Sequence, residues 1–168
     1  ETLLKYNPAF SKEELELGYS FFREEKFSAN DLICKAGKVC EYLFFAESSI
    51  TRCFYLDSEG QEQTLWMKPE ATFITEYKSF VNQAPSQFSL QFYEDTRVWM
   101  ISRKDILHLF QASKNWSLFG VSLTEQVHIT LIDVFVNLLA NDATSNYQYI
   151  EYMFPRFLQV APLKDIAS

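Results

Sequence analysis

The stretch Trp116–Ala140, WSLFGVSLTEQVHITLIDVFVNLLA, decides how the rest of the chain is interpreted. It contains no proline, a single glycine and far more apolar than charged residues, so it predicts one helix of about 36 Å at 1.5 Å per residue. Its apolar residues form two stripes at helical spacing. The first stripe consists of Phe119, Leu123, Val127, Leu131, Val134 and Leu138, and the second of Val121, Ile132, Phe135 and Leu139.

A helix that lies on one core needs only one apolar stripe, so the second stripe predicts a second buried surface. We interpret one stripe as the cover of the helix's own domain and the stripe that starts at Phe119 as the seam of a homodimer. The alternative is a helix buried on all sides within one chain, as occurs in mixed α+β domains. Both stripes stop before Asn141 and Asp142, which we predict to be a hinge.

The composition indicates a folded protein with an apolar core. The chain has 168 residues, of which 48% are hydrophobic and sixteen are phenylalanine, and this excludes global disorder. The net charge of −7 excludes nucleic-acid binding through the overall field of the chain. No uninterrupted apolar run approaches the ~18 residues of a membrane span, and the N-terminus lacks the apolar core of a signal peptide. Cys34, Cys40 and Cys53 form no C-x-x-C motif and predict free thiols in a reducing compartment, so we expect a cytoplasmic protein without a membrane partner.

The first 22 residues carry a specific helix-start signal. Ser11 stands at the N-cap position and Glu14 three residues later, as in a capping box, while Phe10 and Leu15 occupy the positions of a hydrophobic staple. The pattern predicts a helix that continues to about Phe22.

The pattern changes between residues 23 and 102, where short apolar segments alternate with turn residues. Segments of five to eight residues separated by Gly, Asp, Asn and Ser predict antiparallel strands, and Asp57–Gly60 is the clearest hairpin turn. Residues 72–85 show no alternation and predict a short helical turn. Many short strands in succession favour a sandwich or a double-stranded β-helix, the jelly roll.

Helical patterns return after Ser102, and the fold class is therefore α+β. Ser102 and Asp105 predict the start of a short helix before the long one, and Asn146–Phe154 predicts a further helix that Pro155 ends. Pro162 suits the first position of a last helix, which contains Leu163, Lys164 and Asp165. Because the sequence stops one turn into this helix, we expect the natural chain to continue. We divide the sequence into a sensor domain at 1–112, a dimerisation helix at 113–141 and an incomplete DNA-binding domain at 142–168.

This order of parts resembles the Crp/Fnr family of bacterial transcription regulators. The segment GKVCEYLFFAESSITRCFYLDSEGQEQTLW at 37–66 is similar to the first half of the family's β-roll. FITEYKSF at 73–80 is similar to its phosphate-binding cassette, and VAPLKDIAS at 160–168 to the first helix of the helix-turn-helix in Bacteroidetes-type members. The resemblance implies a homodimer along the long helix, a small-molecule effector pocket in the roll, and DNA and RNA polymerase as partners.

The resemblance also allows a residue-by-residue test of the effector pocket. Glu76 matches the glutamate that accepts the ribose hydroxyl, but Thr75 replaces the cassette glycine, Ser86 the phosphate-binding arginine and Gln87 its Ser/Thr neighbour. Leu131 and Ile132 replace the hydroxyl residues that contact the base. Without the arginine a cyclic phosphate would be buried without a counter-charge, so we predict no useful affinity for cyclic AMP.

Two alternatives remain for the residues of this pocket. Glu76 is either a ligand or only a capping or surface carboxylate. Tyr77 and the neighbouring phenylalanines either line an apolar pocket or fill the core of the roll. No cofactor is predicted and the effector is unknown.

The sequence does not support an enzyme or a metal protein. His108 and His128 lie in predicted helices, three cysteines are too few for an iron–sulfur cluster, and no nucleophile elbow or phosphate-binding glycine loop occurs. The alternative to a transcription regulator is a stand-alone jelly-roll module that binds a ligand or another protein and does not contact DNA.

Overall fold

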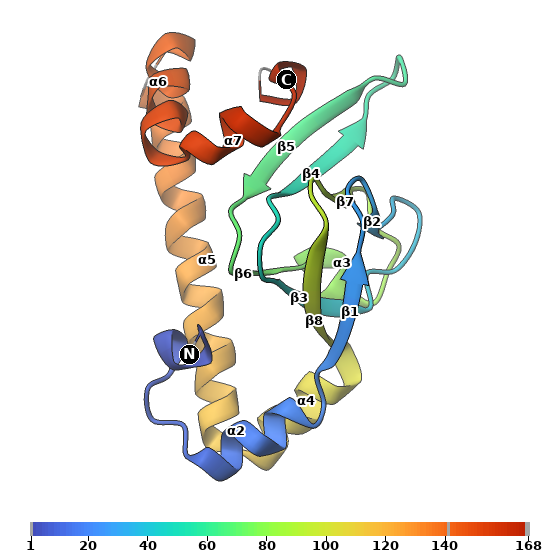
Figure 1. Cartoon of the computed structure of the whole chain (residues 1–168), viewed down its shortest axis with the longest axis vertical. Coiled ribbons are helices and arrows are strands. Elements are labelled where there is room, and N and C mark those ends of the chain that lie inside the picture. Colours follow the sequence, from blue (N-terminus) through green and yellow to red (C-terminus); the bar gives the residue numbers. More distant parts are fainter. Residues whose placement is uncertain (1, 141, 167–168) are drawn as a thin grey trace. The chain divides into compact units, whose positions relative to one another are not determined.

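A computed structural model describes residues 2–140 and 142–166 of the chain (Figure 1). Two compact units emerge, Glu1–Phe21 with Lys104–Met153 and Phe22–Arg103 with Phe154–Ser168, each with its own packing. The first unit is helical and the second contains all the strands of the described residues. The three-part division at residues 112 and 141 stays a prediction.

The β unit is a sandwich of two antiparallel four-stranded sheets, with strand orders β1-β8-β3-β6 and β2-β7-β4-β5. This confirms the predicted α+β jelly-roll fold with a long helix after it. The strands are β1 (Arg23–Phe27), β2 (Leu32–Cys34), β3 (Tyr42–Ala46), β4 (Thr51–Leu56), β5 (Glu62–Lys68), β6 (Thr72–Ile74), β7 (Ser89–Phe92) and β8 (Thr96–Ser102).

The core of the sandwich follows from alternation along these strands. Phe44, Cys53, Leu90, Phe92 and Val98 are buried together between the sheets. The predicted hairpin joins β4 to β5, where Gly60 adopts the positive φ of +78° that its lack of a Cβ permits. The predicted helical turn is α3 (Tyr77–Asn82), which follows β6.

The C-terminal segment belongs to the same unit as the sheets. Its two short helices are α7 (Pro155–Val160) and α8 (Leu163–Ile166), and α8 packs against β5. Pro162 directly precedes α8, so it lies one position before the helix and not at its predicted first position. The helix assigned to the start of a helix-turn-helix is therefore in contact with the β-roll.

The helical unit contains the predicted capping box, at the start of its second helix. Its helices are α1 (Thr2–Tyr6), α2 (Lys12–Tyr19), α4 (Arg103–Ala112, whose first residue lies in the β unit), α5 (Lys114–Ala140) and α6 (Ala143–Met153). Ser11 Oγ accepts a hydrogen bond from the Glu14 amide at 3.2 Å, and Glu14 Oε2 accepts one from the Ser11 amide at 3.0 Å. The helix ends at Tyr19 and not near Phe22, because Ser20 serves as its C-cap.

The first turns of α5 are fixed to α1 and α2. Trp116 and Phe119 are fully buried, and the Phe10 ring lies 4.8 Å from the Trp116 ring. The Trp116 indole donates a hydrogen bond to the Glu14 carbonyl at 2.9 Å. Phe119 was predicted to lie in the dimer seam, and this is wrong because its side chain is enclosed by the chain's own N-terminal helices.

The rest of α5 exposes an apolar surface. Leu123 and Val127 are half-buried, whereas Leu131 and Val134 are 55% and 46% exposed. The second stripe is also exposed, at Val121, Ile132, Phe135 and Leu139. The side chain of Leu138 and the predicted hinge residue Asn141 lie outside the described part of the structure, and Asp142 stands between α5 and α6.

The average hydropathy of α5 is high, although its sequence contains no long uninterrupted apolar run. Lys114–Asn137 is long and apolar enough, by length and composition alone, to cross a membrane. One such helix is weak evidence for a membrane span, and Glu125 and Asp133 interrupt its apolar surface.

Candidate functional site

The cassette residue Glu76 caps helix α3. Its two carboxylate oxygens accept hydrogen bonds from the amides of Lys78 at 3.2 Å and Ser79 at 3.0 Å, and the side chain is 9% exposed. A carboxylate at this position satisfies amides that the first turn of a helix leaves without partners. The capping interpretation of Glu76 is thus observed, and its role as a ribose acceptor stays a prediction.

Hydrogen bonds tie the loop before α3 to the turn that follows β2. Thr75 Oγ1 donates to the Tyr42 carbonyl at 2.9 Å and lies 3.4 Å from Cys40 Sγ. The Cys40 amide in turn donates to Ser79 Oγ at 2.8 Å. The position that replaces the cassette glycine is therefore occupied by a hydroxyl with partners inside the protein.

Ser86, which the sequence resemblance aligns with the family's phosphate-binding arginine, stabilises a tight turn. Its hydroxyl donates to the Phe88 carbonyl at 2.8 Å and accepts from the Phe88 amide at 2.9 Å. Ser86 is 4% exposed, whereas Lys78, the nearest cation in the cassette sequence, is exposed. Among the described residues, these hydrogen bonds of the Glu76 and Ser86 side chains are made to backbone groups and to no basic side chain.

The other candidate pocket residues are more accessible. Tyr77 is 57% exposed and Gln87 is also exposed, so neither side chain is enclosed by the roll. Leu131 and Ile132 are 55% and 50% exposed and belong to the helical unit. The role of these four residues in effector binding stays a prediction.

The three thiols lie in the core of the sandwich and are free. Hydrogen bonding to Cys40, together with burial, raises the pKa of Cys34, and the same hydrogen bond lowers the pKa of Cys40, so Cys40 takes the negative charge of the pair first. Burial raises the pKa of Cys53 to about 12. The free thiols agree with the sequence prediction.

A charged cluster centred on Arg52 was not predicted. Arg52 and Gln91 are opposite each other in the β4–β7 register, next to the core pair Cys53 and Leu90, so they project from the face of this sheet that points away from the core. Arg52 is nevertheless only 2% exposed, and its guanidinium forms ion pairs with Glu62 of β5 and Asp165 of α8 that offset the cost of burying its charge. The signal that could have indicated a buried partner is an arginine within the mostly apolar strand Thr51–Leu56.

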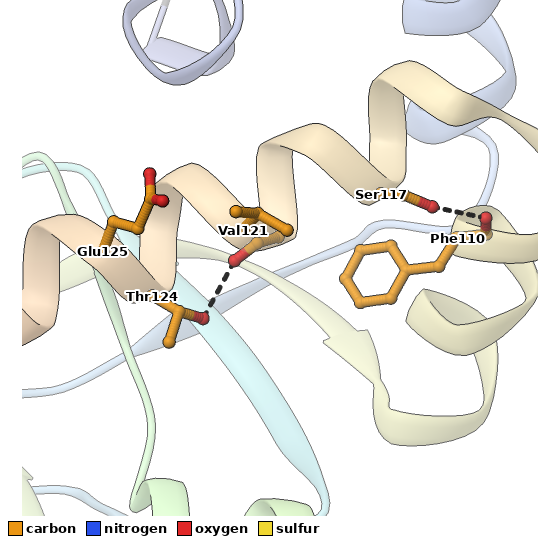
Figure 2. A pocket seen from close by; sticks show the side chains of 6 residues that line it. Phe110, Ser117, Val121, Thr124 and Glu125 are labelled. Atoms are coloured by element: carbon orange, nitrogen blue, oxygen red, sulfur yellow. Dashed lines mark hydrogen bonds between the residues drawn. The ribbon is translucent and has the colours of Figure 1, made fainter.

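A shallow groove lies on the helical unit between α4 and α5 (Figure 2). Its wall contains the Phe110 ring, which lies so close to Gly120 that an added Cβ would be 2.6 Å from Phe110 Cζ. Ser117 Oγ donates to the Phe110 carbonyl at 2.7 Å and Thr124 Oγ1 to the Gly120 carbonyl at 2.9 Å. The groove is open and apolar and holds none of the pocket residues predicted from the sequence.

Among the residues that the structure describes, no group of three or more His, Cys, Asp or Glu side chains forms a metal site.

Comparison with known proteins places this architecture among solved structures. The catabolite activator protein of Thermus thermophilus superposes with a TM-score of 0.64 at 22% identity, over 83% of this chain and 63% of that protein. A cyclic nucleotide-binding domain from Methylobacillus flagellatus superposes with a TM-score of 0.70 at 14% identity, over 83% of this chain and 79% of that domain. The c-di-GMP-responsive regulator CLP of Xanthomonas campestris superposes with a TM-score of 0.70 at 15% identity, over 87% of this chain and 74% of that protein.

These likenesses establish the fold. The chain spans less than two thirds of the length of the Thermus protein. No curated protein sequence matches the chain significantly. The sequence profile of the cyclic nucleotide-binding domain matches residues 24–113, which is more than half of the chain and includes all eight strands except the first residue of β1. The chain therefore belongs to the cyclic nucleotide-binding domain family.

Proposed function

We propose that this chain is the effector-sensing and dimerisation part of a cytoplasmic, Bacteroidetes-type DNA-binding transcription regulator of the Crp/Fnr type. The observation that carries the proposal is the combination of a cyclic nucleotide-binding roll with a long helix whose apolar surface is exposed after its first turns. Solved structures of the same fold include proteins described as transcriptional regulators. The absence of a catalytic cluster from the sequence favours a regulator over an enzyme.

The exposed surface of α5 supports a homodimer. Leu131 and Val134 of the first stripe are 55% and 46% exposed, and exposed apolar surface on a folded protein is often covered by a partner. A second copy of the same helix provides an equally apolar face of equal length. The seam would consist of Leu123, Val127, Leu131, Val134 and Leu138.

The roll is not expected to bind cyclic AMP. Burying a cyclic phosphate requires a paired cation. Ser86, which we align with the position where the family supplies that cation, is buried and hydrogen-bonded to Phe88. Titration of the chain with cyclic AMP in a calorimeter should give no saturable heat at micromolar concentrations. Saturable micromolar binding would contradict this prediction and would favour the interpretation of Glu76 as a ligand.

DNA would be bound by a part of the natural protein beyond this chain. The net charge of −7 makes a DNA contact by the chain itself unfavourable, and α8, with Leu163, Lys164 and Asp165, would be the first helix of the DNA-binding domain. Asn141 and Asp142 would form the hinge between the dimer helix and this domain. RNA polymerase is a further expected partner, and the effector has no assigned identity.

The test is selection from a random DNA pool by the natural full-length protein. A two-fold symmetric dimer should enrich a palindrome with half-sites about one helical turn apart. If no DNA sequence is enriched and the full-length protein binds DNA no better than this chain does, the proposal of a DNA-binding transcription regulator is rejected. The stand-alone roll that acts on a ligand or protein partner would then replace it.

A further inference from the structure

The C-terminal segment Phe154–Ile166 is attached to the roll through a buried ion pair. Asp165 Oδ1 lies 2.7 Å from Arg52 Nη1, and the two side chains are 6% and 3% exposed. The Tyr93 hydroxyl donates a hydrogen bond to the other carboxylate oxygen of Asp165 at 2.9 Å. A carboxylate from α8 is therefore held by groups from β4 and the loop after β7.

Arg52 keeps partners within the roll that do not depend on the segment. Its guanidinium also forms an ion pair with Glu62. It donates a hydrogen bond to Gln91 Oε1 at 3.1 Å and lies 4.2 Å from the centre of the Phe54 ring. Loss of one partner from a buried ion pair is costly when the remaining charge is left alone. Because Glu62 stays, the roll can lose Asp165 without leaving Arg52 unpaired.

A second set of ion pairs lies at the rim of the same contact. Arg156 of α7 donates through Nη2 to both carboxylate oxygens of Glu94, at 2.7 and 2.9 Å, and its Nη1 lies 3.0 Å from Glu70. These side chains are about one third exposed, so water and salt weaken the pairs. The buried pair at Arg52 is thus the contact on which attachment of the segment depends most.

We propose that Arg52 and Asp165 form a latch that holds the segment Phe154–Ile166 on the outer face of the β2-β7-β4-β5 sheet and releases it without unfolding the roll. The latch is a property of this chain alone, and only its consequence rests on the proposed function. In a regulator, release would free the first helix of the DNA-binding domain from the sensor. Neutralising Asp165 opens the latch, whereas neutralising Glu62 leaves it closed.

Hydrogen exchange on the intact chain tests the latch with a matched pair of variants. Asp165→Asn and Glu62→Gln each remove one carboxylate from the same guanidinium, the first from the segment and the second from the roll. Asp165→Asn should accelerate exchange of the Phe157 and Ala161 amides, which α7 protects, at least tenfold, while amides of β3 and β8 exchange as in the wild type. Glu62→Gln should leave the Phe157 and Ala161 amides within about twofold of the wild type.

Each other result would reject the latch. Unchanged exchange in Asp165→Asn would show that the pair does not hold the segment, and equal acceleration in both variants would show a general effect of Arg52. Equal acceleration of β3 and β8 would show that the roll unfolds with the segment. Arg156→Gln, the rim variant, should have an effect that disappears in 1 M salt. Because no DNA is present, these outcomes are independent of the DNA selection described above.

Discussion

The Cys53 thiol links the pH of the solution to the stability of the roll. Its pKa of about 12 in the folded state lies well above the ordinary value of about 8.5 because the side chain is buried among apolar groups. Between these values the unfolded chain releases the proton and the folded chain keeps it. The stabilising contribution is therefore present in full below the ordinary pKa and is lost as the pH rises towards 12.

The predicted result is a fall in the free energy of unfolding above pH 9, with up to ~1.4 kcal/mol per pH unit from this thiol. Cys53→Ala removes the titrating group, so its stability should be lower at pH 7 because of the cavity but should fall less steeply between pH 9 and pH 11. Urea unfolding at a series of pH values measures both slopes. If the free energy of unfolding falls equally steeply with pH in the wild type and in Cys53→Ala, the raised pKa of Cys53 is contradicted.

Single residues also show where the sequence was sufficient and where it was not. Ser11 and Glu14 were recognised because a capping box is local, with both partners within one helical turn. Arg52 and Asp165 were not paired, because no pattern along the chain indicates which strand a distant helix will cover. For Glu76 the sequence left two roles open, a ligand or a capping or surface carboxylate. The structure showed that both of its carboxylate oxygens accept amide hydrogen bonds from α3.

At the scale of elements, close contact between α2 and α5 depends on a glycine. A Cβ at Gly18 would overlap the indole of Trp116, which is fully buried and held by its hydrogen bond to the Glu14 carbonyl. Gly18→Ala should therefore destabilise the chain by about 1–3 kcal/mol, although alanine favours a helix more than glycine does. The shift of the urea midpoint measures this effect.

Gly120→Ala is the matched control in α5. Its Cβ would meet the ring of Phe110, which is half-exposed and can move aside, so the gain in helix propensity of about 1 kcal/mol should offset most of the cost. If Gly18→Ala is as stable as Gly120→Ala, the proposed packing of Trp116 on Gly18 is wrong.

Element types were easier to predict than the surfaces that they bury. The alternation in residues 23–102 correctly indicated a sandwich, and the turn at Asp57–Gly60 is the observed hairpin. The stripes of α5 were identified correctly as apolar, but periodicity does not say what covers each residue. Phe119 was assigned to a second copy and instead packs on Tyr6 and Phe10, since the N-terminal helices are not visible from the stripe itself.

For the whole molecule, the central prediction is the oligomeric state. Leu131→Glu places a charge in the proposed dimer seam and should convert a dimer to a monomer, because burying an unpaired carboxylate costs more than the apolar contact gains. Ile129→Glu adds the same charge at equal exposure, 54% against 55%, on the opposite side of the helix, and should stay dimeric. Sedimentation velocity distinguishes the two species.

Two results of this experiment would reject the seam. One is a Leu131→Glu variant that remains a dimer, and the other is a wild-type chain that sediments as a monomer at tens of micromolar. Dissociation by Ile129→Glu alone would instead place the interface on the other side of α5.

The fixed base of α5 makes the helix a lever arm. Trp116 and Phe119 hold one end against α1 and α2, while the exposed residues up to Leu139 extend about 30 Å beyond it at 1.5 Å per residue. A tilt of about 10° at Phe119 would displace Leu139 by about 5 Å, roughly one helical turn. A change of a few tenths of an ångström in how Trp116 rests on Gly18 would thus be amplified at the far end of the helix.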